Sequence, residues 1–432
     1  MSKNIAEKAA FRFYNLAWGL AIPFLRRNRR LAEGFRQRTL RDKVPEKADV
    51  WIQAASAGES YLAWSLLKSL EPAYPIRVLL TSNTSQGFEI LERAVCDVAS
   101  DGNMTAHAAY FPFDKPAIME VAVRSIQPKV MVLLELEIWP GLLSALKRHD
   151  SKILIINGRI TPKSLRRYLA WPSLWRSLKP DKVLAISEND AERFASLFGK
   201  EQVEVMPNIK FDRIGDPAAH AENPLRKMFP PDMSLTVLGS TRREEEPLIE
   251  KIISDIHRRN PQGVIALFPR HIHRVKHWES ALTQLAIPWA LRSRAEGAVS
   301  PGTLILWDTF GELSLAYGLS KAVYVGGGLA PLGGQNFLEP LTCGIIPVIG
   351  PSWENFAWVG QEIVDQGLVR VAADWKEVAD ILTETIENPK SYEKVCEATL
   401  RYVKDRQGGT YLACCLINSF LPRPGCFEVT DL

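Results

Sequence analysis

Glutamates follow two predicted buried strands and are the strongest candidates for acid–base chemistry. Glu59 comes shortly after the apolar run 50–55, and Glu135 and Glu137 come directly after the apolar run 130–134. In an open parallel sheet the ligand lies beyond the carboxyl ends of the strands, so we expect these residues at the ligand-binding edge. A carboxylate there suits a general base if it reaches the proton to be removed. The alternatives are structural: Glu59 as a first-turn glutamate favoured by the helix dipole, and the second pair as a cap.

A glycine-rich segment in the second half of the chain suits a phosphate-bearing ligand. Residues 324–351 contain two glycine clusters between two apolar runs. Glycines let the backbone approach a ligand closely, and a helix N-terminus attracts anions. We predict that a helix begins at about Gln335–Asn336 and that Asn336 and Glu339, three residues apart, share one of its faces. The spacing matches neither GxGxxG nor GxxxxGK[ST], and plain tight turns are the alternative interpretation.

Two further loops carry side chains suited to a phosphate. Ser240 and Thr241 follow one predicted strand, and Arg270 and His271 follow the next. Hydroxyl and amide groups donate hydrogen bonds to phosphate oxygens, and the guanidinium group of Arg270 can do so with two parallel bonds. A single histidine such as His271 is more often structural.

Strands and helices alternate along both halves of the 432-residue chain, which predicts two doubly wound α/β domains. With 46% hydrophobic and 24% charged residues, the composition is that of an ordinary globular protein. The six cysteines show no spacing typical of a metal site, and we interpret them as reduced thiols. The predicted divisions are a basic segment 1–43, an N-terminal domain 44–206, a linker 207–231, a C-terminal domain 232–409, and a segment 410–432 that crosses back to the first domain.

The N-terminal segment predicts contact with an anionic membrane surface. Residues 1–43 contain eleven lysines and arginines against three acids, a net charge of +8, so the rest of this +4 chain carries −4. The apolar stretch 13–25 is shorter than the roughly 20 residues that span a bilayer, and no signal-peptide cleavage site follows it. We predict an interfacial helix with Phe13, Tyr14 and Trp18 at headgroup depth and the following arginines on anionic lipid. The alternative is a packing arm on the first domain.

Eight short motifs lie in order along essentially the whole chain: SAGE at 56–59, LELEIWP at 134–140, NGR at 157–159, NIKFD at 208–212, GST at 239–241, PRH at 269–271, DTFGEL at 308–313 and GGQNFLEP at 333–340. Together they resemble the 3-deoxy-D-manno-octulosonic acid (Kdo) transferases of lipopolysaccharide biosynthesis. The resemblance implies the GT-B glycosyltransferase fold, with two Rossmann-like domains facing across a cleft and an N-terminal membrane-associating helix. It also implies transfer of Kdo from CMP-Kdo to a lipid A precursor of the lipid IVA type, at the cytoplasmic face of the inner membrane of a Gram-negative-type bacterium.

The resemblance also implies roles for individual residues. Glu59 resembles the family's catalytic base, and Glu137 its second essential acid. Ser56 and Arg159 are the candidates for acceptor binding. The candidates for donor binding are Lys210, Ser240, Thr241, Arg270, His271, Asn336 and Glu339. Gln53, Gln335, Arg242 and Trp307 stand where the family usually has three histidines and a glycine.

The expected partners are CMP-Kdo, the lipid A precursor and the membrane surface, with no nucleic acid and no obligate protein partner. No cofactor or metal ion is expected, because cationic and backbone donors can stabilise the CMP leaving group. The lack of a DxD motif in the chain fits a reaction without a metal ion. Two alternatives stay open at this point: a nucleotide-sugar 2-epimerase of the same fold, and a non-catalytic membrane-bound protein that binds a nucleotide sugar.

Overall fold

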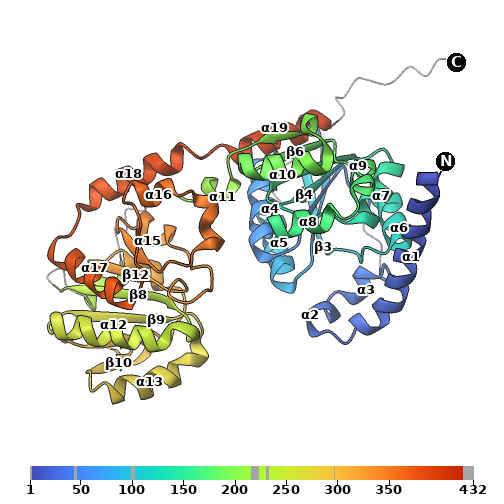
Figure 1. The fold of residues 1–432 in the computed structure, drawn as a ribbon. Helices are drawn as coiled ribbons and strands as arrows, with labels where there is room; N and C mark the ends of the chain where they lie inside the picture. The colour runs from blue at the N-terminus through green and yellow to red at the C-terminus, as the bar shows by residue number, and fades with distance from the viewer. Residues whose placement is uncertain are drawn as a thin grey trace. The chain divides into compact units, whose positions relative to one another are not determined.

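The computed structural model describes residues 2–42, 46–98, 103–215, 223–229, 233–295 and 297–421. They form two compact units, each built on its own sheet (Figure 1). Unit 1 comprises residues 1–213 and 407–432, and unit 2 comprises residues 214–406. The first division falls inside the predicted linker.

The sheet of unit 1 has seven parallel strands in the order β3-β2-β1-β4-β5-β6-β7. This is a doubly wound topology. Strand β1 pairs with β2 along one of its edges and with β4 along the other, so the direction in which the sheet grows reverses at β1. The strands are β1 (Val50–Ala54), β2 (Ile76–Ser82), β3 (Met104–Tyr110), β4 (Val130–Leu134), β5 (Lys152–Gly158), β6 (Lys182–Ala185) and β7 (Val203–Val205). The helices are α1 (Ser2–Leu25), α2 (Arg29–Ala32), α3 (Phe35–Arg38), α4 (Ala57–Ser69), α5 (Ser85–Val98), α6 (Pro116–Ile126), α7 (Pro140–Arg148), α8 (Pro162–Tyr168), α9 (Pro172–Ser177), α10 (Glu188–Phe198) and α11 (Ile209–Asp212), with a 3-10 turn η1 (Lys200–Gln202).

Successive side chains of a strand point to opposite faces of the sheet. Each face of this sheet packs against helices and has its own hydrophobic core. Ile52 of β1 belongs to a core with Leu66 of α4 and Ile417, whereas Trp51 belongs to a core on the other face with Leu142 of α7. Strands buried on both faces read as continuous apolar runs, which is why β1, β4 and β5 were recognisable in the sequence.

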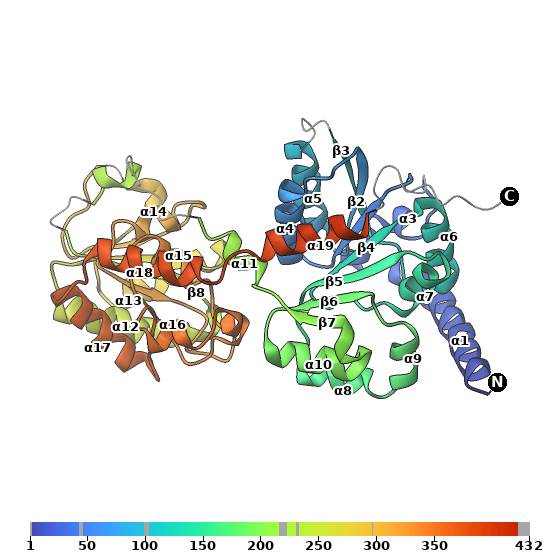
Figure 2. The same cartoon turned by 90° about the horizontal axis from the view of Figure 1, so that it is seen from above.

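The last helix, α19 (Gly409–Phe420), belongs to unit 1. It lies beside α4 (Figure 2), where the Cys414 thiol contacts the carbonyl oxygen of Leu66 at 3.6 Å. Asp212 holds the start of α19 in place, because the Asp212 carboxylate accepts hydrogen bonds from the Gly408 and Thr410 backbone N–H groups.

Helix α1 packs on unit 1 beside α6 with one face and exposes the opposite face (Figures 1 and 2). The inward face includes Tyr14, whose hydroxyl donates to Asp114 at 3.0 Å, and Trp18, whose ring lies 5.8 Å from that of Phe113. The prediction that Tyr14 and Trp18 lie at headgroup depth is therefore wrong, because both are committed to packing. The outward face is apolar and consists of Phe13, Leu16, Leu20 and Phe24, which are 61–73% exposed.

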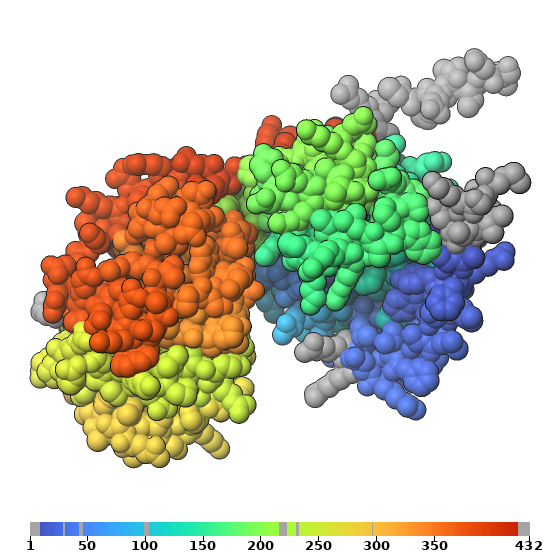
Figure 3. Space-filling view, in the orientation of Figure 1, coloured from blue at the N-terminus to red at the C-terminus, as the bar shows by residue number. Residues whose placement is uncertain are grey.

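Not every arginine of the basic segment is at the surface. Arg38 is buried and donates to the backbone carbonyl oxygens of Glu33, Phe111 and Asn83. Desolvation by this burial lowers the pKa of its guanidinium group to about 10. Arg38 therefore ties the segment to the sheet of unit 1. In the space-filling view the segment forms an exposed blue surface (Figure 3).

Unit 2 repeats the plan, with seven parallel strands in the order β10-β11-β9-β8-β12-β13-β14. The strands are β8 (Leu235–Thr241), β9 (Val264–Pro269), β10 (Trp289–Leu291), β11 (Leu304–Leu306), β12 (Ala322–Val325), β13 (Pro347–Ile349) and β14 (Arg370–Val371). The helices are α12 (Glu246–Arg259), α13 (Val275–Gln284), α14 (Leu313–Tyr317), α15 (Leu338–Thr342), α16 (Glu362–Asp365), α17 (Trp375–Glu387) and α18 (Tyr392–Lys404). Short 3-10 turns complete it: η2 (Pro224–Lys227), η3 (Arg243–Glu245), η4 (Ile272–Arg274), η5 (Arg292–Arg294) and η6 (Glu354–Val359).

Candidate functional site

Glu59 lies in the first turn of α4, immediately beyond the carboxyl end of β1. Ser56 is the N-cap residue, and its hydroxyl oxygen accepts from the Glu59 backbone N–H at 3.3 Å. The Glu59 carboxylate accepts from the Ala55 backbone N–H at 2.7 Å and from the Ser56 hydroxyl at 3.0 Å. Ser56 and Glu59 thus cap the start of α4 together, although the carboxylate accepts from the backbone of Ala55, the residue before the N-cap, and not from that of Ser56 as in a capping box. The structural interpretation of Glu59 therefore holds, and a chemical role would be additional to it.

Glu137 is 9% exposed and is held by three donors to one oxygen, Oε2. Trp139 Nε1 donates at 2.8 Å, Gln53 Nε2 at 3.2 Å and Asn83 Nδ2 at 3.4 Å. Gln53 is itself fixed, because its Oε1 accepts from the Thr81 hydroxyl at 2.6 Å. A side chain within β1 and two that follow β2 and β4 thus converge on one oxygen of this carboxylate, and none of these donors bonds to the other oxygen.

The charge of Glu137 affects the ionisation of Glu59. Desolvation by burial, followed by the charge of Glu137 and then that of Glu135, raises the pKa of Glu59 to about 7, although the hydrogen bond from the Ala55 N–H acts in the opposite direction. Burial also raises the pKa of Glu137, and its donors, led by Trp139, oppose this rise. A carboxylate that ionises near neutral pH has the property needed of a general base.

If Glu59 is the base, kcat/KM should rise with pH through about 7, because only the ionised carboxylate accepts a proton. Glu135→Gln should move this ascending limb to lower pH, since it removes one of the negative charges that disfavour ionisation of Glu59. The measurement is a pH–rate profile between pH 5 and 9. A profile without an ionisation in the rising limb would contradict the assignment.

Lys210 and Arg159 belong to unit 1 but lie outside its strands: Lys210 is in α11, and Arg159 directly follows β5. Lys210 Nζ forms an ion pair of 2.7 Å with Glu135, the residue that directly follows β4. Arg159 follows β5, the neighbour of β4 in the sheet, and is partly exposed. The amide nitrogens Nδ2 of Asn157 and Asn208 are buried without a hydrogen-bond partner, although each residue's Oδ1 accepts from the backbone of α11.

In unit 2, a buried carboxylate organises the glycine-rich segment. Glu245 is 0% exposed, and it accepts from the Gly327 N–H at 2.8 Å, the Arg242 N–H at 3.0 Å and the Tyr324 hydroxyl at 3.2 Å. A Cβ at Gly326 would lie 2.4 Å from a Glu245 oxygen, so only glycine fits there. Part of the glycine pattern that suggested a ligand therefore serves internal packing. Burial raises the pKa of Glu245, and the donors, led by the Gly327 N–H, oppose the rise.

The predicted helix beginning at Gln335–Asn336 is wrong in its start. Helix α15 begins at Leu338 and has five residues. Asn336 precedes it and accepts from the Leu338 N–H at 3.3 Å, so Asn336 and Glu339 do not share a helix face. The loop has this form because the Gly334 N–H bonds back to the Gly327 carbonyl oxygen at 2.9 Å.

The remaining predicted donor-binding residues lie on loops after β8 and β9. Ser240 has a positive φ of 55°, and the hydroxyl of Thr241 is buried with no hydrogen-bond partner. Arg270 is exposed and close enough to Glu339 for its charge to favour ionisation, although burial dominates and raises the pKa of Glu339. His271 is exposed, and desolvation and the charge of Arg242 lower its pKa. These roles stay predictions.

Sequence reasoning missed the residues that hold Glu137. Trp139 was within a recognised motif, and Gln53 was noted only as a departure from the family. Gln53 lies in β1 and Asn83 follows β2, and nothing in the sequence links either of them to Glu137. In the described part of the chain, no group of three or more His, Cys, Asp or Glu side chains is arranged to hold a metal ion.

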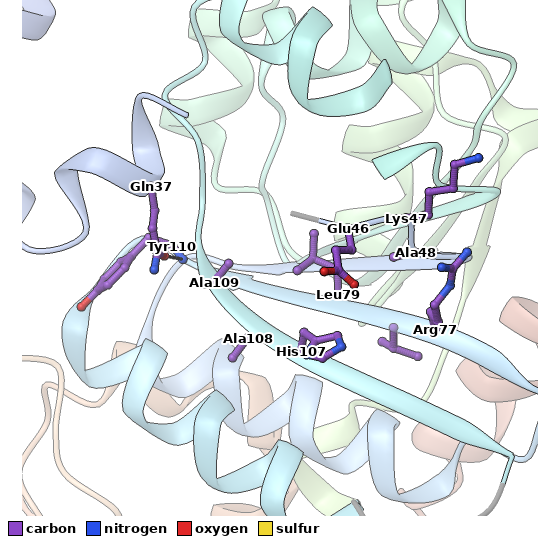
Figure 4. Close-up of a pocket in the computed structure, with 11 residues that line it drawn as sticks. Gln37, Glu46, Lys47, Ala48, Arg77, Leu79, His107, Ala108, Ala109 and Tyr110 are labelled. Carbon is purple, nitrogen blue, oxygen red and sulfur yellow. Dashed lines mark hydrogen bonds between the residues drawn. The ribbon is translucent and has the colours of Figure 1, made fainter. Parts of the chain in front are cut away.

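A separate hollow of about 290 Å³ lies over β2 and β3 of unit 1. Figure 4 shows the Glu46 carboxylate pointing toward His107, with Lys47 and Arg77 at one end and Gln37 at the other. It contains none of the predicted site residues.

Known sequences resemble this chain along most of its length. A bifunctional glycosyltransferase/methyltransferase from Fusobacterium nucleatum is 29% identical over 398 residues, 88% of this chain; the chain spans 60% of that relative's length. A 3-deoxy-D-manno-octulosonic acid transferase from Haemophilus influenzae is 28% identical over 392 residues, 88% of each chain.

Solved structures share the fold. A glycosyltransferase from Rickettsia africae superposes with a TM-score of 0.57 at 10% identity, over 88% of this chain and 100% of its own. A UDP-GlcNAc 2-epimerase from Neisseria meningitidis does so with a TM-score of 0.55 at 14% identity, over 86% and 99%. The two parallel seven-stranded α/β units therefore agree with the GT-B-like, two-domain part of the predicted fold class. Identities this low support a conclusion about the fold alone.

The family match concerns the unit that carries the two carboxylates. Residues 29–213 match the sequence model described as 3-deoxy-D-manno-octulosonic-acid transferase (kdotransferase), and this match ends where unit 1 first ends. Three 3-deoxy-D-manno-octulosonic acid transferases, from Haemophilus influenzae, Bordetella pertussis and Chlamydia pneumoniae, are each 28% identical to this chain over 82–88% of its length.

Proposed function

We propose that this protein transfers Kdo from CMP-Kdo to a lipid A precursor of the lipid IVA type, in a single inverting displacement. The observation that carries the proposal is the half-buried Glu59, whose pKa is raised to about 7, together with the buried Glu137, in the unit that matches the family model. Glu59 removes the proton of the acceptor hydroxyl, whose oxygen forms the new bond to the anomeric carbon of Kdo. The bond from that carbon to the CMP phosphate oxygen breaks, and CMP leaves with the electron pair.

Glu137, the second acid, orients the substrate or stabilises charge that develops on the sugar. Three donors fix one oxygen of Glu137, which leaves the other available to hold a substrate hydroxyl or to oppose positive charge at the sugar. In unit 2, Arg270 takes the CMP phosphate, assisted by Ser240, Thr241 and His271, while Glu339 with Asn336 holds ribose hydroxyls. The reaction as proposed runs without a metal ion, so chelation of divalent metals in an assay supplied with preformed CMP-Kdo should leave the rate unchanged.

Transfer of labelled Kdo to a tetraacylated lipid A precursor tests the class of reaction. Product resolved by mass would establish transfer and count the sugars added. If CMP-Kdo raises the thermal stability of the protein and no product forms with this acceptor, the proposed acceptor is wrong.

We also propose that α1 binds the surface of an anionic membrane. No helix among the described residues is long and apolar enough to cross a membrane. The outward face of α1 presents Phe13, Leu16, Leu20 and Phe24, and the exposed residues Arg12, Arg26 and Arg27 lie on the same helix or directly after it. Apolar side chains in the interface with nearby cations on anionic headgroups are the two contributions that hold such helices on a bilayer.

Leu16→Glu with Leu20→Glu should abolish most sedimentation with anionic vesicles, because each change places a charge where an apolar side chain would enter the interface. Neither residue packs on the domain, so the thermal unfolding temperature should change little. The matched control is Tyr411→Glu with Leu412→Glu, which adds the same charge at exposed apolar positions of α19. Undiminished sedimentation of the first variant would exclude this face as the membrane contact.

A further inference from the structure

The α8–α9 hairpin of unit 1, here residues 159–179, is strongly basic. It contains six lysines and arginines and no aspartate or glutamate, although the whole chain has 53 of the former and 49 of the latter. In the described part of the chain, none of the six forms an ion pair with a carboxylate, and all but Arg159 are exposed. The six are Arg159, Lys163, Arg166, Arg167, Arg176 and Lys179. An unneutralised charge of this density is suited to a polyanionic ligand.

Hydrogen bonds hold the start of the hairpin just beyond the carboxyl end of β5. The Ile160 N–H donates to Asp190 at 2.9 Å, and Arg193 donates to the Ile160 carbonyl oxygen at 3.1 Å. Thr161 caps α8 by accepting from the Ser164 N–H at 3.1 Å. The cations are therefore presented on a fixed support.

The support also adjoins the candidate site. The hairpin begins where β5 ends, and β5 pairs with β4, which Glu135 and Glu137 follow. Tyr168, in the last turn of α8, is close enough to Glu137 for that charge to raise its pKa, after the larger effect of burial. Its ring packs against Trp175 of α9 at a centroid distance of 5.0 Å. The basic helix thus flanks a predicted catalytic carboxylate.

The turn between α8 and α9 adds an apolar element. Leu169 and Trp171 are 39% and 37% exposed, in the same segment as the cations. Cations and exposed apolar side chains on one hairpin match a ligand with an anionic headgroup and an acyl part.

We propose that this hairpin binds the acceptor, with Arg166 and Arg167 on a headgroup phosphate and with Leu169 and Trp171 against its apolar part. The inference rests on the proposed function, since it names the subsite for that acceptor. Guanidinium groups suit this task because two parallel N–H bonds match the geometry of phosphate. The position beside Glu137 distinguishes the acceptor from bulk lipid as the occupant.

The test compares the full-length protein with its Arg166→Glu, Arg167→Glu variant in detergent micelles, using a phosphorylated tetraacylated lipid A precursor. The KM for this acceptor should rise at least about tenfold, as expected when charge-assisted hydrogen bonds are lost. The KM for CMP-Kdo should stay within about twofold. The matched control reverses two exposed cations elsewhere in unit 1, Lys68 of α4 and Arg93 of α5, and should leave both values unchanged.

Three outcomes would overturn the proposal. They are an unchanged acceptor KM, an equal preference of the wild-type protein for phosphorylated and phosphatase-treated precursor, and a variant that loses only its binding to anionic vesicles. The milder Arg166→Ala, Arg167→Ala variant gives the same comparison if charge reversal impairs folding. Equilibrium binding of the precursor, followed by tryptophan fluorescence, requires no turnover. A wild-type protein that binds the precursor through the hairpin and transfers no Kdo would contradict the proposed function alone.

Discussion

Replacing Glu59 with glutamine should lower kcat by about 10²- to 10⁴-fold, the range over which a positioned general base contributes. Glutamine keeps the size of the side chain and can still accept from the Ala55 N–H, so the cap on α4 should survive. It cannot take up the proton of the acceptor hydroxyl. The measurement is steady-state transfer of Kdo from CMP-Kdo, with the KM for the donor expected to change little.

This variant separates the two interpretations of Glu59, because a residue needed only as a cap would tolerate glutamine. Activity close to that of the wild-type protein would exclude Glu59 as the base and leave it a structural role. The control is Glu71→Gln, the same isosteric change at an exposed glutamate shortly after α4. Its kcat should equal that of the wild-type protein, and all three proteins should unfold at similar temperatures.

Replacing Glu245 with alanine should lower the free energy of unfolding by about 3 kcal/mol or more, because each buried donor left without a partner costs about 1–3 kcal/mol. The groups affected are the backbone N–H groups of Gly327 and Arg242 and the hydroxyl of Tyr324. The glycine-rich segment would lose the carboxylate that fixes its backbone, so protection of the protein by CMP-Kdo should weaken as well. Urea unfolding and thermal shift with added CMP-Kdo measure the two effects.

The control for this prediction is Glu244→Ala. Glu244 is exposed and adjacent in the sequence, and its contact with Arg242 is a long surface ion pair of 3.8 Å. Such pairs contribute little, so its effect should be within about 0.5 kcal/mol. Equal stability of the Glu245 and Glu244 variants would mean that the buried hydrogen bonds of Glu245 are readily replaced.

Local sequence was a good guide to the inner strands and a poor one to the rest. Runs such as Val130–Leu134 are apolar throughout because both faces are covered, and they were recognised with their bounds. Strand β3 reads MTAHAAY and carries no such signal, since it is an edge strand with partly exposed side chains. Helix α15 was expected too early because turn hydrogen bonds between glycine-rich loops, rather than helix propensity, determine the path of residues 333–337.

The sequence by itself determined the class of fold, the two α/β halves, and the position of Glu59 and Glu137 after strands, because each depends on residues close together in the chain. Only the tertiary structure decided which side of α1 is exposed, since both of its sides are apolar and packing of Tyr14 and Trp18 on unit 1 makes the choice. It also decided the ionisation of Glu59. Burial and the charges of Glu137 and Glu135 raise its pKa, and those residues lie more than seventy positions away in the chain.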